Sequence, residues 1–378
     1  MKKLIFAFIS AALILSGCSA ITYGEYKYSE PHSVSPPSHA DSSAVIGLGT
    51  REELDEALLD LVERHSSYGR LRFVSYEGDV RSDLADACVK LTGSEPLGAF
   101  SVYYVNYSLD LIVSQYEADV SITYKRTAAE CAALGELSGE DLIAAIEDAL
   151  EKRTVSLAFY CDEPEFDVST LDAELDRIYF SASSMLYRPE GELASYPATG
   201  ERRICEITFT YPYSYQETQT RLSQVELAID GLLDGLEDLE GEELITAAAL
   251  RLAEFTEFDE EKEQAGEYSP WAQAYTAYGA LVHRRAAGEG FALAMKRILA
   301  RRGLDCIVVR GELDGVYHSW NIVYSDSGEP RHIDASLADP DSGELIFYTD
   351  DELNEGYFWS GEYPVCAADS QEEIEEGS

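Results

Sequence analysis

The chain is poor in positive charge. It has 28 Lys and Arg residues against 71 Asp and Glu residues, a formal net charge of -43 over 378 residues. A field of that sign repels phosphate, so we do not expect nucleic acid as a partner, and anionic lipid headgroups are disfavoured for the same reason. No acidic run has the ligand spacing of an EF-hand loop, and we therefore interpret the acidity as a means of keeping a crowded surface protein soluble.

Metal-binding and redox motifs are also lacking. No two cysteines form a CxxC pair, and none clusters with histidine along the sequence, so we expect no metal ion and no cofactor. Six cysteines follow Cys18, an even number that permits disulfides in an exported chain, but their wide spacing does not indicate a dense disulfide framework. We favour buried free thiols for several of them. The six are Cys88, Cys131, Cys161, Cys205, Cys306 and Cys366.

The first 17 residues are typical of a secretory signal peptide. Met1-Lys2-Lys3 supplies positive charge, and Leu4 to Leu15 is an apolar stretch too short to cross a bilayer as an ordinary helix. Leu15-Ser16-Gly17-Cys18 resembles the lipobox of bacterial lipoproteins, in which the peptide is cleaved before the cysteine and the thiol is joined to diacylglycerol. The resemblance implies lipidation at Cys18 and a location on the extracytoplasmic face of the cell membrane.

The rest of the chain has a globular composition, with 46% hydrophobic and 26% charged residues. Residues 18–50 contain prolines and polar residues without an apolar period, which predicts a flexible tether, and residues 368–378 form an acidic tail. Between them a helix and strand order recurs, which predicts two related α+β modules over residues 51–135 and 136–238. For example, Val120–Tyr124 and Ile207–Tyr211 alternate polar and apolar residues in the same way.

The last predicted domain, residues 239–367, contains a pattern with chemical meaning. Helices are expected over Glu243–Phe255 and from Gly288 to about Arg302, and a strand over Cys306–Val309. A hairpin follows, in which counting back along antiparallel strands from the turn places His318 opposite Asp334 within a residue or two. An imidazole beside a carboxylate can orient a general base, although such a pair can also be purely structural.

These segments resemble the transglutaminase-like superfamily, which has a papain-like architecture. The resemblance is carried by the Tyr-x-Ala-Tyr-Gly-Ala-Leu-Val and Gly-x-Gly-Phe-Ala motifs, by His318-Ser319-Trp320-Asn321 and by His332-Ile333-Asp334. It implies an α+β fold, a His318 and Asp334 pair from a catalytic triad, and a substrate cleft. The implied cleft residues are Glu289, Gly290, Trp320 and Asn321.

The family's nucleophilic cysteine is missing from this chain. Its position falls on Gly288, and no thiol or hydroxyl stands within two residues on either side. Because the members of a triad act as a unit, losing the nucleophile removes most of the rate. We therefore favour a catalytically inactive domain that binds a peptide, a cell-wall component or an envelope protein. The alternative is an active peptidase, amidase or acyltransferase with an unusual nucleophile.

Overall fold

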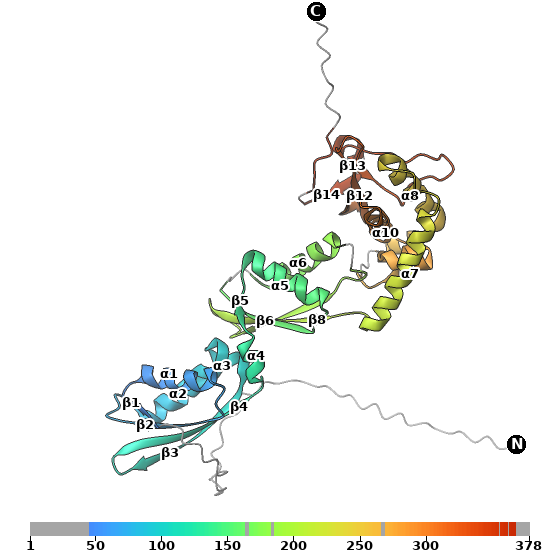
Figure 1. Cartoon of the computed structure of the whole chain (residues 1–378). Helices are drawn as coiled ribbons and strands as arrows, with labels where there is room; N and C mark the ends of the chain where they lie inside the picture. Colours follow the sequence, from blue (N-terminus) through green and yellow to red (C-terminus); the bar gives the residue numbers. More distant parts are fainter. Residues whose placement is uncertain are drawn as a thin grey trace, which may run out of the picture. The chain divides into compact units, whose positions relative to one another are not determined.

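The computed structural model describes residues 45–162, 166–182, 185–265, 269–354, 356–361 and 363–367. The predicted signal peptide, the lipidation site at Cys18 and the acidic tail lie outside these residues, as does the tether up to residue 44. Within the described ranges, no helix is both long enough and apolar enough to cross a membrane. Helices and strands follow one another along the whole described chain, so the fold is α+β (Figure 1).

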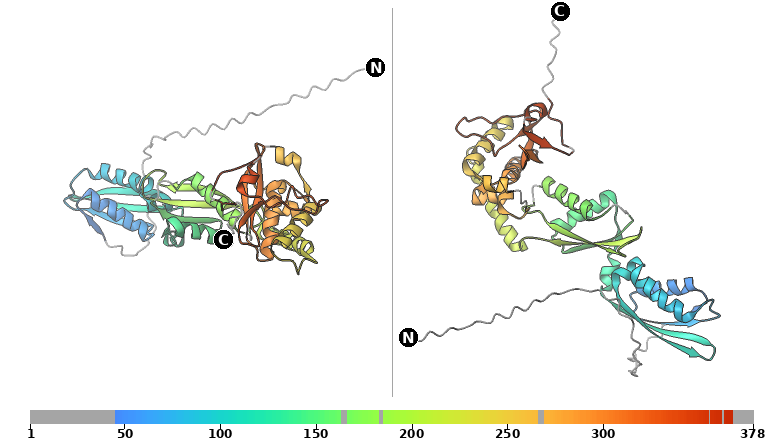
Figure 2. Two further views of the ribbon diagram at one scale, coloured as in Figure 1. Left: turned by 90° about the horizontal axis from the view of Figure 1, so that it is seen from above. Right: turned by 180° about the vertical axis from the view of Figure 1, so that it is seen from behind.

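The N-terminal module is a four-stranded sheet with the strand order β1-β2-β4-β3. Strands β1 and β2 are parallel, whereas β4 runs antiparallel to both β2 and β3. Buried leucines on α1 and α2 pack against the apolar face of the sheet, and Figure 2 shows the helices together on one face. The elements are β1 (Ile46–Leu48), α1 (Arg51–Glu63), β2 (Tyr68–Phe73), α2 (Val80–Gly93), α3 (Pro96–Ser101), β3 (Val102–Ile112), β4 (Gln115–Tyr124) and α4 (Ala128–Ala132).

The second module repeats this topology. Its sheet has the order β5-β6-β8-β7, again with one parallel pair followed by two antiparallel pairs, and Val120–Tyr124 and Ile207–Tyr211 fall largely in the equivalent strands β4 and β8. The two modules are therefore related in structure as well as in sequence pattern. The elements are β5 (Gly135–Glu136), α5 (Gly139–Glu151), β6 (Ser156–Cys161), α6 (Val168–Ser181), β7 (Glu190–Tyr196) and β8 (Arg203–Thr210).

Two predicted boundaries need correction. The tether was expected to reach residue 50, but Ile46–Leu48 forms β1 and pairs with Leu71–Phe73 of β2. A three-residue strand is too short to give a readable alternation. The boundary between residues 238 and 239 also shifts, because α7 (Tyr215–Leu233) buries Val225 and Ile229 in the same core as the C-terminal helices.

The C-terminal domain packs helices against an antiparallel sheet of order β13-β12-β11-β14. Helix α10 contacts both β11 and β12, and most of its residues are buried, so it forms the centre of the domain. The elements after α7 are α8 (Gly241–Phe255), β9 (Glu257–Phe258), α9 (Glu260–Gln264), η1 (Gln273–Tyr275), η2 (Gly279–His283), β10 (Arg285–Ala286), α10 (Gly288–Arg301), β11 (Cys306–Leu313), β12 (Val316–Tyr324), β13 (Pro330–Ile333), α11 (Asp350–Leu353) and β14 (Tyr357–Trp359).

The six cysteines of the described residues form no disulfide, and five of them are buried. Burial raises the pKa of the Cys306 thiol to about 12, and the nearby Lys296 ammonium only partly offsets this effect. Cys306 therefore stays protonated in the core at neutral pH and is not a nucleophile.

Candidate functional site

The site is built around the first turn of α10. Gly288 is the first residue of this helix, and the preceding N-cap residue, Ala287, has no side chain that could accept hydrogen bonds from the exposed amides. The acceptor comes from elsewhere in the chain, since the Gly288 N–H donates to Oε2 of Glu263 over 2.8 Å. A carboxylate thus lies at the positive end of the helix dipole, where negative charge is stabilised.

His318 and Asp334 come together across neighbouring strands. Asn321 on β12 pairs with Ile333 on β13. Asp334 follows Ile333 directly, so it lies two residues along the chain from the position that would face His318. Nε2 of His318 lies 2.7 Å from Oδ2 of Asp334. The count along the hairpin thus leads to a real contact between the two side chains.

Asp334 is held by four hydrogen bonds. Tyr357 donates its hydroxyl to Oδ2 over 2.8 Å, and Ser336 donates both its N–H, over 2.9 Å, and its hydroxyl, over 2.6 Å, to Oδ1. Burial alone would raise the pKa of this carboxyl, but the hydrogen bonds and the charge of His318 outweigh burial and hold it below its usual value. Asp334 is therefore a fixed, ionised partner of the imidazole.

Glu263 contacts the other side of the imidazole. Oε1 of Glu263 is hydrogen-bonded to Nδ1 of His318, so the ring lies between two carboxylates. Burial on its own would lower the pKa of His318, yet the hydrogen bonds and charges of Asp334 and Glu263 outweigh it and raise the pKa to about 9. At neutral pH the ring is an imidazolium that donates one N–H to each carboxylate.

The imidazole also fills the space of the missing nucleophile. A Cβ atom on Gly288 would lie 2.5 Å from Cε1 of His318 and 3.1 Å from the carbonyl oxygen of Ser319. The ring cannot easily move away, because it is only 1% exposed and is bonded on both sides. Glycine is therefore the residue that fits at the start of α10 with the histidine in this position.

This arrangement does not supply the parts of a nucleophilic triad. An imidazolium beside a helix N-terminus can activate a nucleophile only if a thiol or hydroxyl lies next to it. Ser319, the neighbouring hydroxyl, instead donates to the hydroxyl of Tyr317 over 3.4 Å. Among the described residues, the ring nitrogens of His318 are bonded to Glu263 and Asp334 and to no thiol or hydroxyl. The site holds a buried ion triplet.

The expectation that four further residues line an open cleft is corrected by their burial. Trp320 and Asn321 lie on β12 in the core, and the amide of Asn321 donates to backbone carbonyls of α10 and β11. Glu289 is only 1% exposed and accepts a hydrogen bond from Tyr317. A Cβ on Gly290 would lie 2.5 Å from the carbonyl oxygen of Ala274, so this glycine allows close packing of backbone.

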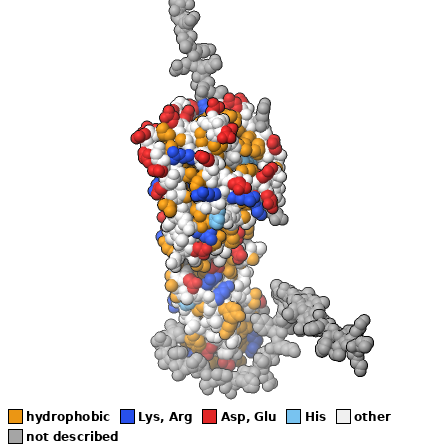
Figure 3. Space-filling view, turned by 90° about the vertical axis from the view of Figure 1, so that its right-hand side faces the viewer, with side chains coloured by type: hydrophobic (Ala, Val, Ile, Leu, Met, Phe, Trp, Pro, Cys, Tyr) orange, Lys and Arg blue, Asp and Glu red, His pale blue; other side chains and the backbone are white. Residues whose placement is uncertain are grey.

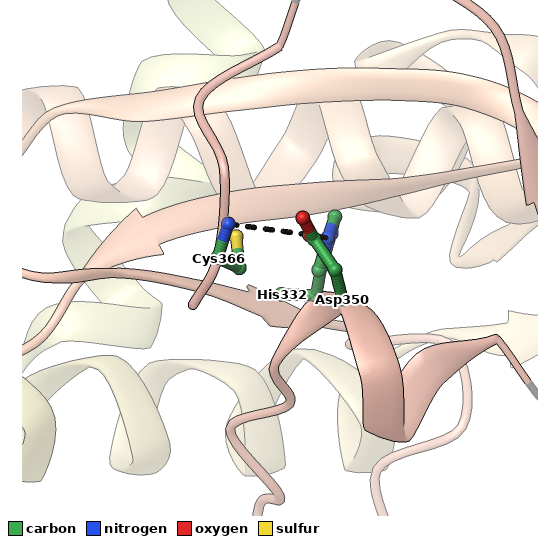
Figure 4. A group of neighbouring side chains, drawn as sticks. All are labelled: His332, Asp350 and Cys366. Atoms are coloured by element: carbon green, nitrogen blue, oxygen red, sulfur yellow. Dashed lines mark hydrogen bonds and ion pairs between the residues drawn. The ribbon is translucent and has the colours of Figure 1, made fainter. Parts of the chain in front are cut away.

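A second polar cluster lies beside the site, formed by His332, Asp350 and Cys366 (Figure 4). The indole N–H of Trp320 donates to Nδ1 of His332 over 2.9 Å, so the hydrogen of the neutral imidazole is on Nε2, which donates to Oδ1 of Asp350 over 2.9 Å. Burial keeps the ring neutral by lowering its pKa, despite the Asp350 carboxylate.

These hydrogen bonds are unfavourable for metal binding. A metal on Nε2 of His332 would require the hydrogen on Nδ1, where it would face the N–H of Trp320. Burial also raises the pKa of the Cys366 thiol to about 12. The backbone N–H of Cys366 donates to Asp350 over 3.2 Å, so the cluster fastens the segment around Cys366 to α11.

Sequence reasoning found His318, Asp334 and the helix start at Gly288 but missed Glu263 and Tyr357. Glu263 lies in the segment Glu260–Gln264, in which three of the five residues are acidic, and such a segment would be assigned to a solvated surface. The one signal for it was indirect. The amides of a helix N-terminus without a capping side chain or a thiolate need another acceptor, and a side chain from elsewhere in the chain can supply it.

Comparisons with known proteins give the following similarities. No protein-family model matches the chain, and no curated protein matches its sequence. A solved structure described as a TGase has 14% identity and a TM-score of 0.29, and the match covers 58% of this chain and 61% of that one. A proposed cysteine protease from Cytophaga hutchinsonii has 14% identity and a TM-score of 0.25, with 42% and 65% covered.

A proposed protease from Parabacteroides distasonis has 8% identity and a TM-score of 0.21, and the match covers 74% of this chain and 44% of that one. The chain therefore spans less than two thirds of the length of each of these three proteins. At such TM-scores the likeness assigns no role to any residue of this chain.

Proposed function

We propose that the protein is a lipid-anchored surface protein whose C-terminal domain is transglutaminase-like, catalytically inactive and used as a binding or scaffold module. The ligands in keeping with this role are peptides, cell-wall fragments and envelope proteins. Nucleic acid is disfavoured by the net charge of -43 and by the many acidic side chains on the face shown in Figure 3.

One observation carries the proposal of inactivity: the Glu263 carboxylate connects the Gly288 N–H to Nδ1 of His318. In the family that the chain resembles, a thiolate at this helix N-terminus is paired with the imidazolium. Here a carboxylate from α9 provides the same negative charge in the same electrostatic setting. The charge balance of the site is preserved, and the nucleophile is not.

Inactivity also follows from the chemistry of the carboxylate. Attack by the Glu263 carboxylate on an amide would form an anhydride, which is less stable than the amide that it replaces. An enzyme with an unusual nucleophile would need a hydroxyl or thiol beside His318, and Ser319 is directed toward Tyr317. The geometry therefore argues against turnover.

The experiment is a turnover assay with glutamine-containing peptides, amine acceptors and peptidoglycan fragments. The natural protein should give the same background rate as a His318→Ala variant. The double variant Gly288→Cys with Glu263→Ala serves as the positive comparison, because it introduces a thiol and removes the competing carboxylate. A rate for the natural protein that falls in His318→Ala would overturn the proposal.

A further inference from the structure

The hairpin between β3 and β4 ends in three consecutive apolar residues that face solvent. Leu111 is 60% exposed, Ile112 is 51% exposed and Val113 is 97% exposed. Single exposed apolar side chains are common, but a run of three at a projecting tip is unfavourable in water and indicates a contact site. No part of this hairpin contributes to the site around α10.

The backbone at the tip supports this interpretation. Val113 has a φ of 60°, in the left-handed region that a β-branched residue rarely adopts. The turn has two residues, Val113 and Ser114, because Ile112 pairs with Gln115. Of these two only Val113 has a positive φ, and glycine would be the unstrained choice at its position. Since Val113 is almost fully exposed, no packing within the fold offsets the strain, and its side chain is better explained by a contact outside the fold.

The directions of the side chains indicate what kind of medium covers them. Successive residues of a strand point to opposite faces, so Leu111 and Ile112 lie on opposite sides of the hairpin and Val113 lies at its end. A flat protein surface would cover one of these sides only. A lipid layer surrounds an inserted tip, and it would cover all three side chains together.

The charges behind the tip are compatible with this medium. Glu117 is paired with Arg72 over 2.6 Å, and Asp119 is paired with Arg70 over 2.7 Å. Both pairs join β2 to β4, so the arginines neutralise these two carboxylates before the hairpin meets a bilayer. Asp110, which precedes Leu111 on β3, is exposed and adds one negative charge to the surface behind the tip.

The chain length from the proposed anchor keeps the hairpin close to a membrane. About 27 residues separate Cys18 from Val45, and β1 belongs to the same sheet as β3 and β4. Even a fully extended chain of that length spans only about 95 Å, so the bilayer is always within reach of this module. Such tethering makes even weak insertion effective, because the second contact is intramolecular.

We propose that Leu111, Ile112 and Val113 insert into the outer face of the bilayer that holds the lipid anchor, and so provide a second membrane contact. This inference rests on the proposed lipidation at Cys18. The tip would reach the boundary between headgroups and acyl chains, as apolar interfacial segments do. The N-terminal module would then be held at the membrane surface by both its lipid and its hairpin.

The test uses the full lipidated chain reconstituted in phosphatidylcholine vesicles with brominated acyl chains, which quench tryptophan fluorescence on contact. A Val113→Trp variant reports on the tip. A Val89→Trp variant is the matched control, because Val89 is 71% exposed on α2, away from the hairpin tip. The parent chain, with its three native tryptophans, gives the background.

We expect the added tryptophan of Val113→Trp to be quenched at least about twofold more than that of Val89→Trp, with Leu111→Asp reducing the difference. Equal quenching of the two variants in vesicles that carry the protein would overturn the insertion of the hairpin but not the lipid anchor. The tip would then bind a protein surface in place of the bilayer. Failure of the protein to float with vesicles would overturn the anchor, and the hairpin proposal with it.

Discussion

The central change at the residue scale is the replacement of one anion by another. A thiolate at a helix N-terminus is stabilised by backbone amides and by a neighbouring imidazolium. Glu263 meets the same two partners, Gly288 and His318, with the two oxygens of one carboxylate. An ionised carboxylate satisfies both at neutral pH without acting as a nucleophile. The rest of the site, including the four hydrogen bonds on Asp334, can therefore persist as a structural element.

A Gly288→Ala substitution should destabilise the protein by about 1–3 kcal/mol, because the new methyl group overlaps the ring of His318. The matched control is Gly231→Ala, which adds a methyl group to α7 with open space around it and should stabilise by about 0.4–1 kcal/mol. The free energy of unfolding from urea titration distinguishes them. A neutral effect of Gly288→Ala would show that the space beside His318 is not closed.

At the element scale, an ion network joins α6 to β11. Asp176 on α6 contacts Arg310 of β11 over 2.5 Å and also pairs with Arg188, whose side chain is only 7% exposed. Arg310 in turn donates to the hydroxyl of Tyr317 over 3.0 Å, which is bonded to Glu289 of α10. One carboxylate thus satisfies two guanidinium groups and connects the second module to the buried helix α10.

Replacing Asp176 with Ala should cost about 1.5–3 kcal/mol of stability, because two partly buried guanidinium groups lose a charged acceptor. Asp172→Ala is the control. Asp172 also pairs with Arg188, but its side chain is 67% exposed, and such surface pairs contribute about 0–1 kcal/mol. Thermal unfolding of both variants measures the difference, and equal losses would contradict the bridging role of Asp176.

Strong apolar periods made most of the elements predictable from sequence. The alternation of polar and apolar residues in β4 and β8 and the helical patterns of α8 and α10 predicted elements that the structure contains. Short elements escaped prediction for a physical reason. The strand β1 and the helix α9 are too short to show a period, and tertiary contacts hold them in place.

At the scale of the whole molecule, sequence reasoning recovered the half of the site that lies on one hairpin. His318 and Asp334 are joined by local strand register, which can be counted. Glu263 reaches Gly288 from 25 residues away and His318 from 55 residues away, through packing that no period encodes. In a chain with 71 acidic residues, one buried glutamate cannot be separated from the solvated ones by composition.

The predicted lipid anchor at Cys18 would determine where the whole molecule is located. A Cys18→Ala variant should leave the protein unprocessed or released, because the lipobox cysteine is both the cleavage marker and the acylated residue. Fractionation after a high-salt wash, together with the apparent mass, measures this. Normal processing with unchanged membrane retention in the variant would contradict lipidation at Cys18.

The charged triplet has a signature in the dependence of stability on pH. The pKa of His318 is raised from 6.5 to about 9 on folding, so its stabilising contribution is fully present below pH 6.5 and is lost as the pH rises through about 9. Glu263→Gln removes one of the two carboxylates and should reduce this loss.

The most direct test of the closed, inactive site is an NMR titration of the His318 imidazole in the natural protein and in Glu263→Gln. A folded-state pKa of about 9 in the natural protein, which falls when Glu263 becomes Gln, is the predicted result. A pKa near the ordinary 6.5, unchanged by Glu263→Gln, would contradict the account, because His318 would then be a neutral base at pH 7, available for catalysis.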